Sequence, residues 1–99
     1  MNLQKRKIWR SPKYLKWVRT QPCEMCGDEY SQKEAHHIKG VGNLSGGALK
    51  APDLFTMSLC KDFNKNCHQE MQNNPDLWPM QWEMVARTLA RAIEDGVLK

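Results

Sequence analysis

The four cysteines and three histidines of this 99-residue chain all fall between residues 23 and 68. A chain of this length buries only a marginal hydrophobic core, and small domains often rely on bound metal or disulfides for stability. Cys23 and Cys26 lie in a C-x-x-C-G turn, which is typical of a zinc knuckle. Cys60 and Cys67 would complete a site of four thiolates, the structural kind of zinc site because no position is left for water.

Two alternatives to this zinc site stay open. The spacing of Cys60 and Cys67, with six residues between them, is wider than the usual two, so His68 could replace Cys67 as a ligand. The other alternative is a disulfide-bonded domain. No apolar run approaches the ~18 residues of a membrane span, and no apolar segment follows the basic N-terminus as in a secretory signal. We therefore expect a cytoplasmic protein with no membrane association, where cysteines favour metal over disulfides.

The histidines and one aspartate form a second set of candidates, which are His36, His37, Asp53 and His68. Phosphodiester hydrolysis needs an activated water and a cation that stabilises the charge developing on the phosphate. A neutral histidine accepts a proton near pH 7, and histidine with aspartate suits a divalent ion that must keep positions open. Neighbours on a regular strand point to opposite faces, so His36 and His37 can both serve only if the strand bends or ends there.

Several motifs together resemble a known family. They are Cys-x-x-Cys at 23–26, Ala-His36-His37-Ile-Lys-Gly, Lys50-Ala-Pro-Asp53-Leu-Phe-Thr, Leu59-Cys60 and Cys67-His68, with Lys13-Tyr-Leu-Lys-Trp-Val-Arg before them and Arg91-Ala-Ile-Glu-Asp-Gly-Val-Leu after them. In these motifs the chain resembles the HNH (ββα-metal) nucleases. More narrowly, it resembles the phage-encoded DUF968 and recombination-enhancement nuclease families, over residues ~11 to 98.

The resemblance implies a role for each candidate. His37, the second residue of the histidine pair, is then the general base that activates water. A catalytic divalent ion, which is Mg, Mn or Zn, is then held by His36, Asp53 and His68, beside the structural zinc. The chain departs from the family pattern at Gln72, where a second helix histidine often stands, and at residues 61–66, which lengthen the second cysteine pair.

Positive charge is concentrated at the N-terminus. The net charge is +4, and the first 20 residues contain seven basic and no acidic residues. Such a stretch attracts phosphate backbones without reading their sequence, although a solvated face is the commoner role of a charge run. We expect DNA contacts from Lys5, Arg6, Lys7, Arg10 and Lys13, joined near the site by Lys39 and Lys50. Trp17 and Val18 fit a helical packing stripe and are expected in the core.

The expected fold is a basic arm at residues 1–10 followed by one α+β domain at residues 11–99. This domain is a small zinc-stabilised HNH ββα-metal fold with flanking N- and C-terminal helices. Helices are expected from Pro12 to about Arg19, from near Asn66 to a break at 73–75, and from about Pro79 to Asp95, with strands at 35–38 and 54–59. In the last helix an apolar stripe should face the core and Gly96 should end the helix. The stripe consists of Trp82, Val85, Leu89 and Ile93.

The function expected is that of a metal-dependent DNA endonuclease or nickase, mostly sequence-nonspecific and linked to phage recombination or DNA processing. Following the family, its products carry 5′-phosphate and 3′-hydroxyl ends. One alternative is a zinc-stabilised DNA-binding module without catalysis. The other is a recruitment module whose partner is a recombination protein. The sequence does not indicate an oligomeric state.

Overall fold

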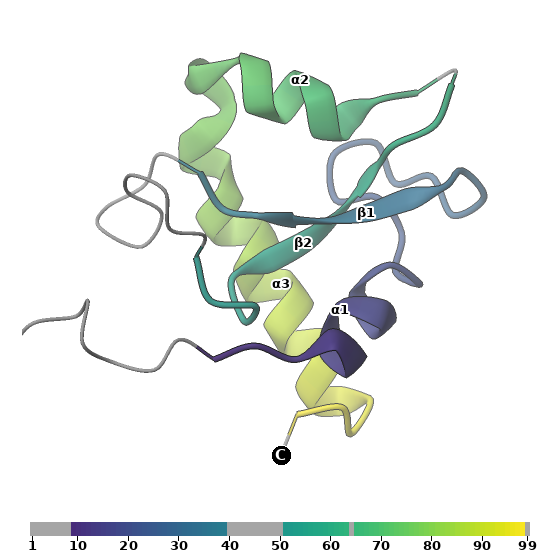
Figure 1. The fold of residues 1–99 in the computed structure, drawn as a ribbon, viewed down its shortest axis with the longest axis vertical. Helices are drawn as coiled ribbons and strands as arrows, with labels where there is room; N and C mark the ends of the chain where they lie inside the picture. Colours follow the sequence, from purple (N-terminus) through teal and green to yellow (C-terminus); the bar gives the residue numbers. More distant parts are fainter. Residues whose placement is uncertain (1–8, 40–50, 64, 99) are drawn as a thin grey trace, which may run out of the picture.

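Figure 1 shows the computed structural model of the chain, which describes residues 9–39, 51–63 and 65–98. The elements described follow in the order α1 (Pro12–Val18), β1 (Lys33–His37), β2 (Thr56–Cys60), α2 (Cys67–Asn73), the 3-10 helix η2 (Pro75–Met80) and α3 (Gln81–Glu94). In this part of the chain, no helix is long and apolar enough to cross a membrane. Outside the described residues lie four of the predicted DNA contacts, Lys5, Arg6, Lys7 and Lys50.

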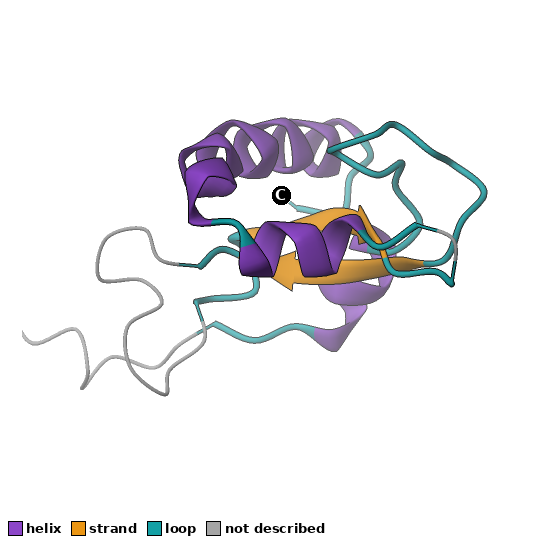
Figure 2. Ribbon diagram, turned by 90° about the horizontal axis from the view of Figure 1, so that it is seen from above, coloured by secondary structure: helices purple, strands orange, loops and turns teal. Residues whose placement is uncertain are grey.

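The two strands pair in antiparallel register, with Lys33 opposite Cys60 and His37 opposite Thr56. Both predicted strands are confirmed, with bounds displaced by one or two residues. All five residues of β2 are buried, because α1, α2 and α3 each pack against this strand. Figure 2 shows the strands lying among the helices. The class is therefore α+β, and β2 is the element on which the helices are assembled.

The first helix confirms the predicted start at Pro12 and the predicted core residues. The hydroxyl of Ser11 accepts a hydrogen bond from the backbone N–H of Tyr14 at 3.1 Å. Tyr14 and Val18 are buried against alanines of β1 and α3. Trp17 stacks on Tyr14 with 5.8 Å between ring centroids and is partly buried against the same cluster.

The later helices follow the predicted boundaries with one addition. Asn66 caps α2, and its side chain accepts a hydrogen bond from the backbone N–H of Gln69 at 2.9 Å. The predicted break at 73–75 is present, but η2 follows it, so α3 begins at Gln81, two residues later than predicted. After α3, Gly96 has a φ of 75°, the left-handed conformation that commonly follows the end of a helix.

The face of α3 that packs on the sheet differs from the prediction. Its buried residues are Gln81, Met84, Val85, Thr88 and Ala92. Two of the four residues predicted to be buried, Trp82 and Ile93, are instead 43% and 63% exposed. The apolar pattern missed Gln81 and Thr88, since polar side chains are buried where they have internal partners. The hydroxyl of Thr88 donates to the backbone carbonyl one turn earlier at 2.9 Å.

An ion-pair cluster joins the C-x-x-C turn to α3. The carboxylate of Glu24, between the two cysteines, accepts hydrogen bonds from Arg87 Nε at 2.9 Å and from Arg91. The Glu24 side chain is only 5% exposed. The backbone N–H of the same residue donates to the carbonyl of Ser58 in β2 at 2.9 Å. This turn is thereby fixed to both the sheet and the last helix.

Trp9 and Arg10, the described part of the predicted arm, contact the rest of the chain. The carbonyl of Trp9 accepts a hydrogen bond from the backbone N–H of Asp53 at 3.1 Å, and its ring lies 5.8 Å from that of Tyr14. Arg10 also contacts Asp53, through an ion pair at 3.1 Å. The last two residues of the predicted arm therefore pack on the domain.

Candidate metal centre and active site

The four cysteines converge as predicted. Their Sγ atoms all lie within 4.8 Å of one another. Cys23 and Cys26 come from the turn before β1, Cys60 is the last residue of β2, and Cys67 is the first residue of α2. The predicted alternative in which His68 takes the place of Cys67 is not adopted, since Cys67 lies with the other three sulfur atoms.

The cluster has the dimensions of a tetrahedral zinc site. Zinc–sulfur bonds of about 2.3 Å place tetrahedral sulfur atoms about 3.8 Å apart. The Sγ atoms of Cys26 and Cys60 are 3.5 Å apart, and the whole cluster falls within 4.8 Å. All four cysteines are free thiols, so the alternative of a disulfide-bonded domain is not adopted. These residues could therefore hold a metal such as zinc.

The geometry of the C-x-x-C turn depends on Gly27. The backbone N–H of Gly27 donates to the carbonyl of Cys23 at 2.8 Å, and that of Cys26 points to the Cys23 sulfur at 3.5 Å. Gly27 has a φ of 79°, which lies in the left-handed region. Glycine adopts this conformation without a steric penalty, whereas other residues lose stability there. The glycine thus closes the turn that brings two thiols to one side.

The thiol of Cys23 ionises unusually easily. Burial would raise its pKa, but hydrogen bonds from the backbone N–H groups of Cys26, Cys60 and Met25 outweigh burial and lower the pKa to about 7. By contrast, burial raises the pKa of Cys67, and the neighbouring thiol of Cys23 adds to that effect. Thiolate is the form that binds metal, so a cation at the cluster would offset the repulsion among these groups.

His36 and His68 form a pair of imidazoles next to this cluster. Their ring centroids are 5.0 Å apart with an interplanar angle of 82°. His36 is 2% exposed, and burial lowers its pKa to about 4, so the ring is neutral at pH 7. Burial also lowers the pKa of His68. Two neutral imidazoles from β1 and α2 are therefore available as ligands for a divalent ion.

His37 forms a separate pair with Asp53. Its Nε2 lies 2.8 Å from Oδ1 of Asp53. The residue Asp53 is only 3% exposed. The carboxylate also accepts hydrogen bonds from Arg10 at 3.1 Å and from the backbone N–H of Ser11 at 2.7 Å. Burial opposes ionisation of Asp53, but the hydrogen bonds from His37, Ser11 and Arg10 outweigh it and lower its pKa. An ionised carboxylate only accepts, so Nε2 of His37 donates, and in the neutral ring Nδ1 is the nitrogen with the lone pair.

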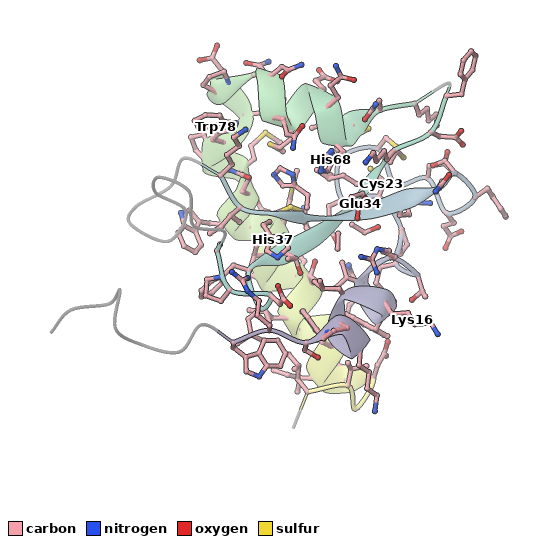
Figure 3. The ribbon with its side chains drawn as sticks, viewed as in Figure 1. Lys16, Cys23, Glu34, His37, His68 and Trp78 are labelled. Atoms are coloured by element: carbon pink, nitrogen blue, oxygen red, sulfur yellow. The ribbon has the colours of Figure 1, made fainter. Side chains whose placement is uncertain are left out.

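The two pairs lie on opposite faces of β1. In Figure 3, His68 lies on one side of the strand and His37 on the other. This separation follows from the alternation expected for neighbours on a strand. Of the three predicted ligands, Asp53 contacts His37, whereas His36 and His68 contact each other. Within the described ranges, the four cysteines form the one group of three or more ligand side chains close enough to share an ion.

Several contacts around the site were not predicted. Gln81 contacts His36 at 3.0 Å, and no sequence signal distinguishes this glutamine from others on helix surfaces. Arg10, predicted to contact DNA, forms an ion pair with Asp53, although only the charge and not the partner could be deduced from the sequence. The predicted DNA contacts Lys13 and Lys39 are exposed, as such a role requires.

These features define a small α+β protein with a four-cysteine cluster able to hold a metal such as zinc. The sequence matches the family described as "Protein of unknown function (DUF968)" over residues 1–96, and the chain belongs to this family. It is similar to "Uncharacterized protein YdfU" of Escherichia coli strain K12, with 38% identity over 98 residues. That match covers 99% of this chain but 27% of the relative. No solved structure matches the chain.

Proposed function

We propose that the chain is a metal-dependent DNA endonuclease or nickase of the HNH (ββα-metal) type. One observation carries the proposal: β1 ends at His37, so the oriented pair of His37 and Asp53 and the neighbouring imidazoles of His36 and His68 can act on one phosphate at the end of the strand. The first pair has the chemistry of a general base, and the second has the chemistry of a metal-ligand pair. A sequence-nonspecific enzyme of phage recombination or DNA processing, working in the cytoplasm, fits this site and the family resemblance.

His37 acts as the base through its Nδ1 atom. Asp53 accepts the hydrogen of Nε2, which holds the ring in one tautomer and stabilises the imidazolium that forms. Water attacks phosphorus, its proton passes to Nδ1, and a new phosphorus–oxygen bond forms. The bond from phosphorus to the 3′ oxygen breaks, its electron pair stays on that oxygen, and solvent supplies the proton. The products are 5′-phosphate and 3′-hydroxyl ends.

His36 and His68 would hold the catalytic ion, which is Mg, Mn or Zn. Bound there, a divalent cation would supply the positive charge that stabilises the phosphorane and the leaving oxygen. Two protein ligands leave positions for phosphate and water. Gln72 lies one helical turn after His68 and, unlike the histidine often found there, adds no strong ligand. Asp53 supports the base and is not part of this ligand set.

DNA binding in this proposal relies on charge rather than base recognition. Lys13 and Lys39 are exposed in the described part of the chain. Lys5, Arg6, Lys7 and Lys50 would add to the attraction for phosphate. Arg10 forms an ion pair with Asp53, so its charge would hold that carboxylate beside the proposed base and add less to phosphate binding. Binding should therefore weaken steeply as the salt concentration rises.

The test is nicking of supercoiled plasmid by the zinc-loaded chain with added Mg, Mn or Zn. His37→Ala should lower the rate by at least about 100-fold, the usual contribution of a general base. Ile93→Ala, an exposed position of α3, serves as the matched control and should leave the rate unchanged. Both variants are compared with the parent for zinc content and thermal unfolding.

Three results would redirect the assignment. Equal nicking by the parent and His37→Ala would remove His37 from the role of base. DNA binding without nicking under any of the three metals would favour the second candidate, a zinc-stabilised binding module. The observation that favours this candidate is that no third ligand lies near His36 and His68 in the described ranges. If low salt gave no DNA binding, a recruitment module for a recombination protein would be the better assignment.

A further inference from the structure

We propose that Gln81 is a positioning residue that fixes His36 with its hydrogen on Nε2, so that His36 binds a divalent ion through Nδ1. The inference rests on the proposed function for the identity of the ligand pair, but the tautomer itself can be measured without any nuclease activity. It concerns a residue that the apolar pattern of α3 did not identify and that is fully buried at the start of that helix.

The orientation of the Gln81 amide is set by backbone groups alone. Its Nε2 donates to the carbonyl of Lys39 at 2.8 Å and to the carbonyl of Trp78 at 3.0 Å. Its Oε1 accepts a hydrogen bond from the backbone N–H of Lys39 at 3.0 Å. A flipped amide would place an oxygen against two carbonyl oxygens and an NH2 group against an N–H. The assignment of nitrogen and oxygen therefore follows from partners whose character is fixed.

This orientation decides which nitrogen of His36 carries hydrogen. Nε2 of His36 lies 3.0 Å from the same Oε1 of Gln81. An amide oxygen only accepts, so Nε2 has to donate. The neutral imidazole, which is the form that binds a metal, carries only one hydrogen. Nδ1 is thus left with the free lone pair, the form of nitrogen that binds a metal.

The contact with Gln81 determines which nitrogen of His36 can bind an ion in the proposed site. His36 lies with its ring centroid 5.0 Å from that of His68, and Gln81 occupies the Nε2 side of the ring. Nε2 is therefore closed to a cation, which leaves Nδ1 as the nitrogen that can bind one. Groups that orient a metal-binding histidine in this way typically change metal affinity by about 10- to 100-fold when removed.

Long-range 1H–15N NMR on the zinc-loaded full chain tests the tautomer directly. The parent protein at pH 7 should show one His36 tautomer with hydrogen on Nε2. Zn2+ added beyond the first equivalent should then shift the Nδ1 resonance while Nε2 stays protonated. Hydrogen on Nδ1, or loss of the Nε2 hydrogen on adding the metal, would overturn the proposal. If the tautomer is as stated but neither resonance of His36 moves, the metal site of the proposed function fails, while the role of Gln81 in fixing the ring stands.

Two variants separate positioning from simple support of the fold. Gln81→Met has a similar shape but no acceptor, so His36 should populate both tautomers, and its affinity for added Zn2+ should fall about 10- to 100-fold. Gln81→Glu keeps an acceptor for Nε2 of His36, and its second oxygen, when protonated, can donate to the carbonyls of Lys39 and Trp78, so the ring should return to the Nε2–H form. Unchanged tautomer and affinity in Gln81→Met would contradict the proposal. Should either variant fail to fold, the spectra of the parent still decide it.

Discussion

Burial should decide how much each ion pair of Arg87 contributes to stability. Arg87 contacts two carboxylates at the same distance, 2.9 Å, with its Nε on Glu24 and its Nη1 on Glu83. The Glu24 side chain is 5% exposed and that of Glu83 is 78% exposed. Glu24 has a second partner in Arg91. The substitutions Glu24→Gln and Glu83→Gln therefore compare two contacts of Arg87 at one distance that differ in solvent access and in the second arginine at Glu24.

The stability expected to be lost in Glu24→Gln lies between two limits. Removing one partner of a fully buried pair costs about 3–5 kcal/mol, because the other charge loses its compensation. An exposed pair contributes about 0–1 kcal/mol. Since Arg87 and Arg91 are 45% and 33% exposed, water partly compensates for the loss at Glu24. Glu24→Gln should therefore cost about 2 kcal/mol, which for a domain of this size lowers the Tm by roughly 10 °C.

Urea unfolding of the zinc-loaded protein, followed by circular dichroism, measures both variants. Glu24→Gln should keep one zinc per chain, because the four thiols are unchanged. Glu83→Gln should lie within about 0.5 kcal/mol of the parent, as an exposed pair within one helix does. Equal losses for the two variants, or a loss below about 0.5 kcal/mol at Glu24, would refute the reasoning that burial decides the difference.

The cysteine cluster, Tyr14 and Asp53 carry further predictions. Metal analysis should find one zinc per chain, and Cys60→Ser or a chelator should unfold the protein, since structural zinc contributes on the order of 10 kcal/mol; a native circular dichroism spectrum without zinc would contradict this. The buried hydroxyl of Tyr14 has no hydrogen-bond partner among the described residues, so Tyr14→Phe should cost nothing in urea unfolding at pH 7, and a loss above about 1 kcal/mol would reveal a missing partner. Burial raises the pKa of Tyr14 to about 12; because an unfolded tyrosine ionises near about 10, stability should fall as the pH rises between these values, less steeply in Tyr14→Phe. Asp53→Asn should slow nicking at least about 100-fold, because an amide can donate to His37 and favour the wrong tautomer, whereas an unchanged rate would exclude Asp53 as the partner of the base.

Local signals in the sequence predicted the elements well. Ser11 and Asn66 cap α1 and α2 through side-chain hydrogen bonds that depend only on nearby residues. The α3 face was misjudged because its burial depends on partners far away in the chain. Gln81 is buried because it forms hydrogen bonds with residues 36 and 39. These residues are too far away in the sequence for the apolar pattern of one helix to reveal them.

The sequence predicted which residues form the candidate site better than it predicted which of them lie together. The sequence identified four cysteines that do converge, because few other arrangements suit so many thiols in a short chain. It also identified the alternation that separates His36 from His37. It did not indicate on which face Asp53 would lie, since that depends on the turn before β2. There the carbonyl of Asp53 accepts a hydrogen bond from the hydroxyl of Thr56 at 2.8 Å, while its carboxylate contacts His37.

The cysteine cluster and the histidine pair are coupled by one peptide bond. Cys67 is the first residue of α2 and His68 is the second, so whatever holds the sulfur also sets where the imidazole lies. His36 is fixed independently, by β1 and by Gln81 of α3. A cation on the four thiols would therefore hold α2 against the sheet and keep His68 beside His36. Loss of zinc should consequently separate the two imidazoles before it disturbs His37 and Asp53, which are attached to the other face of the strand through Arg10 and Ser11.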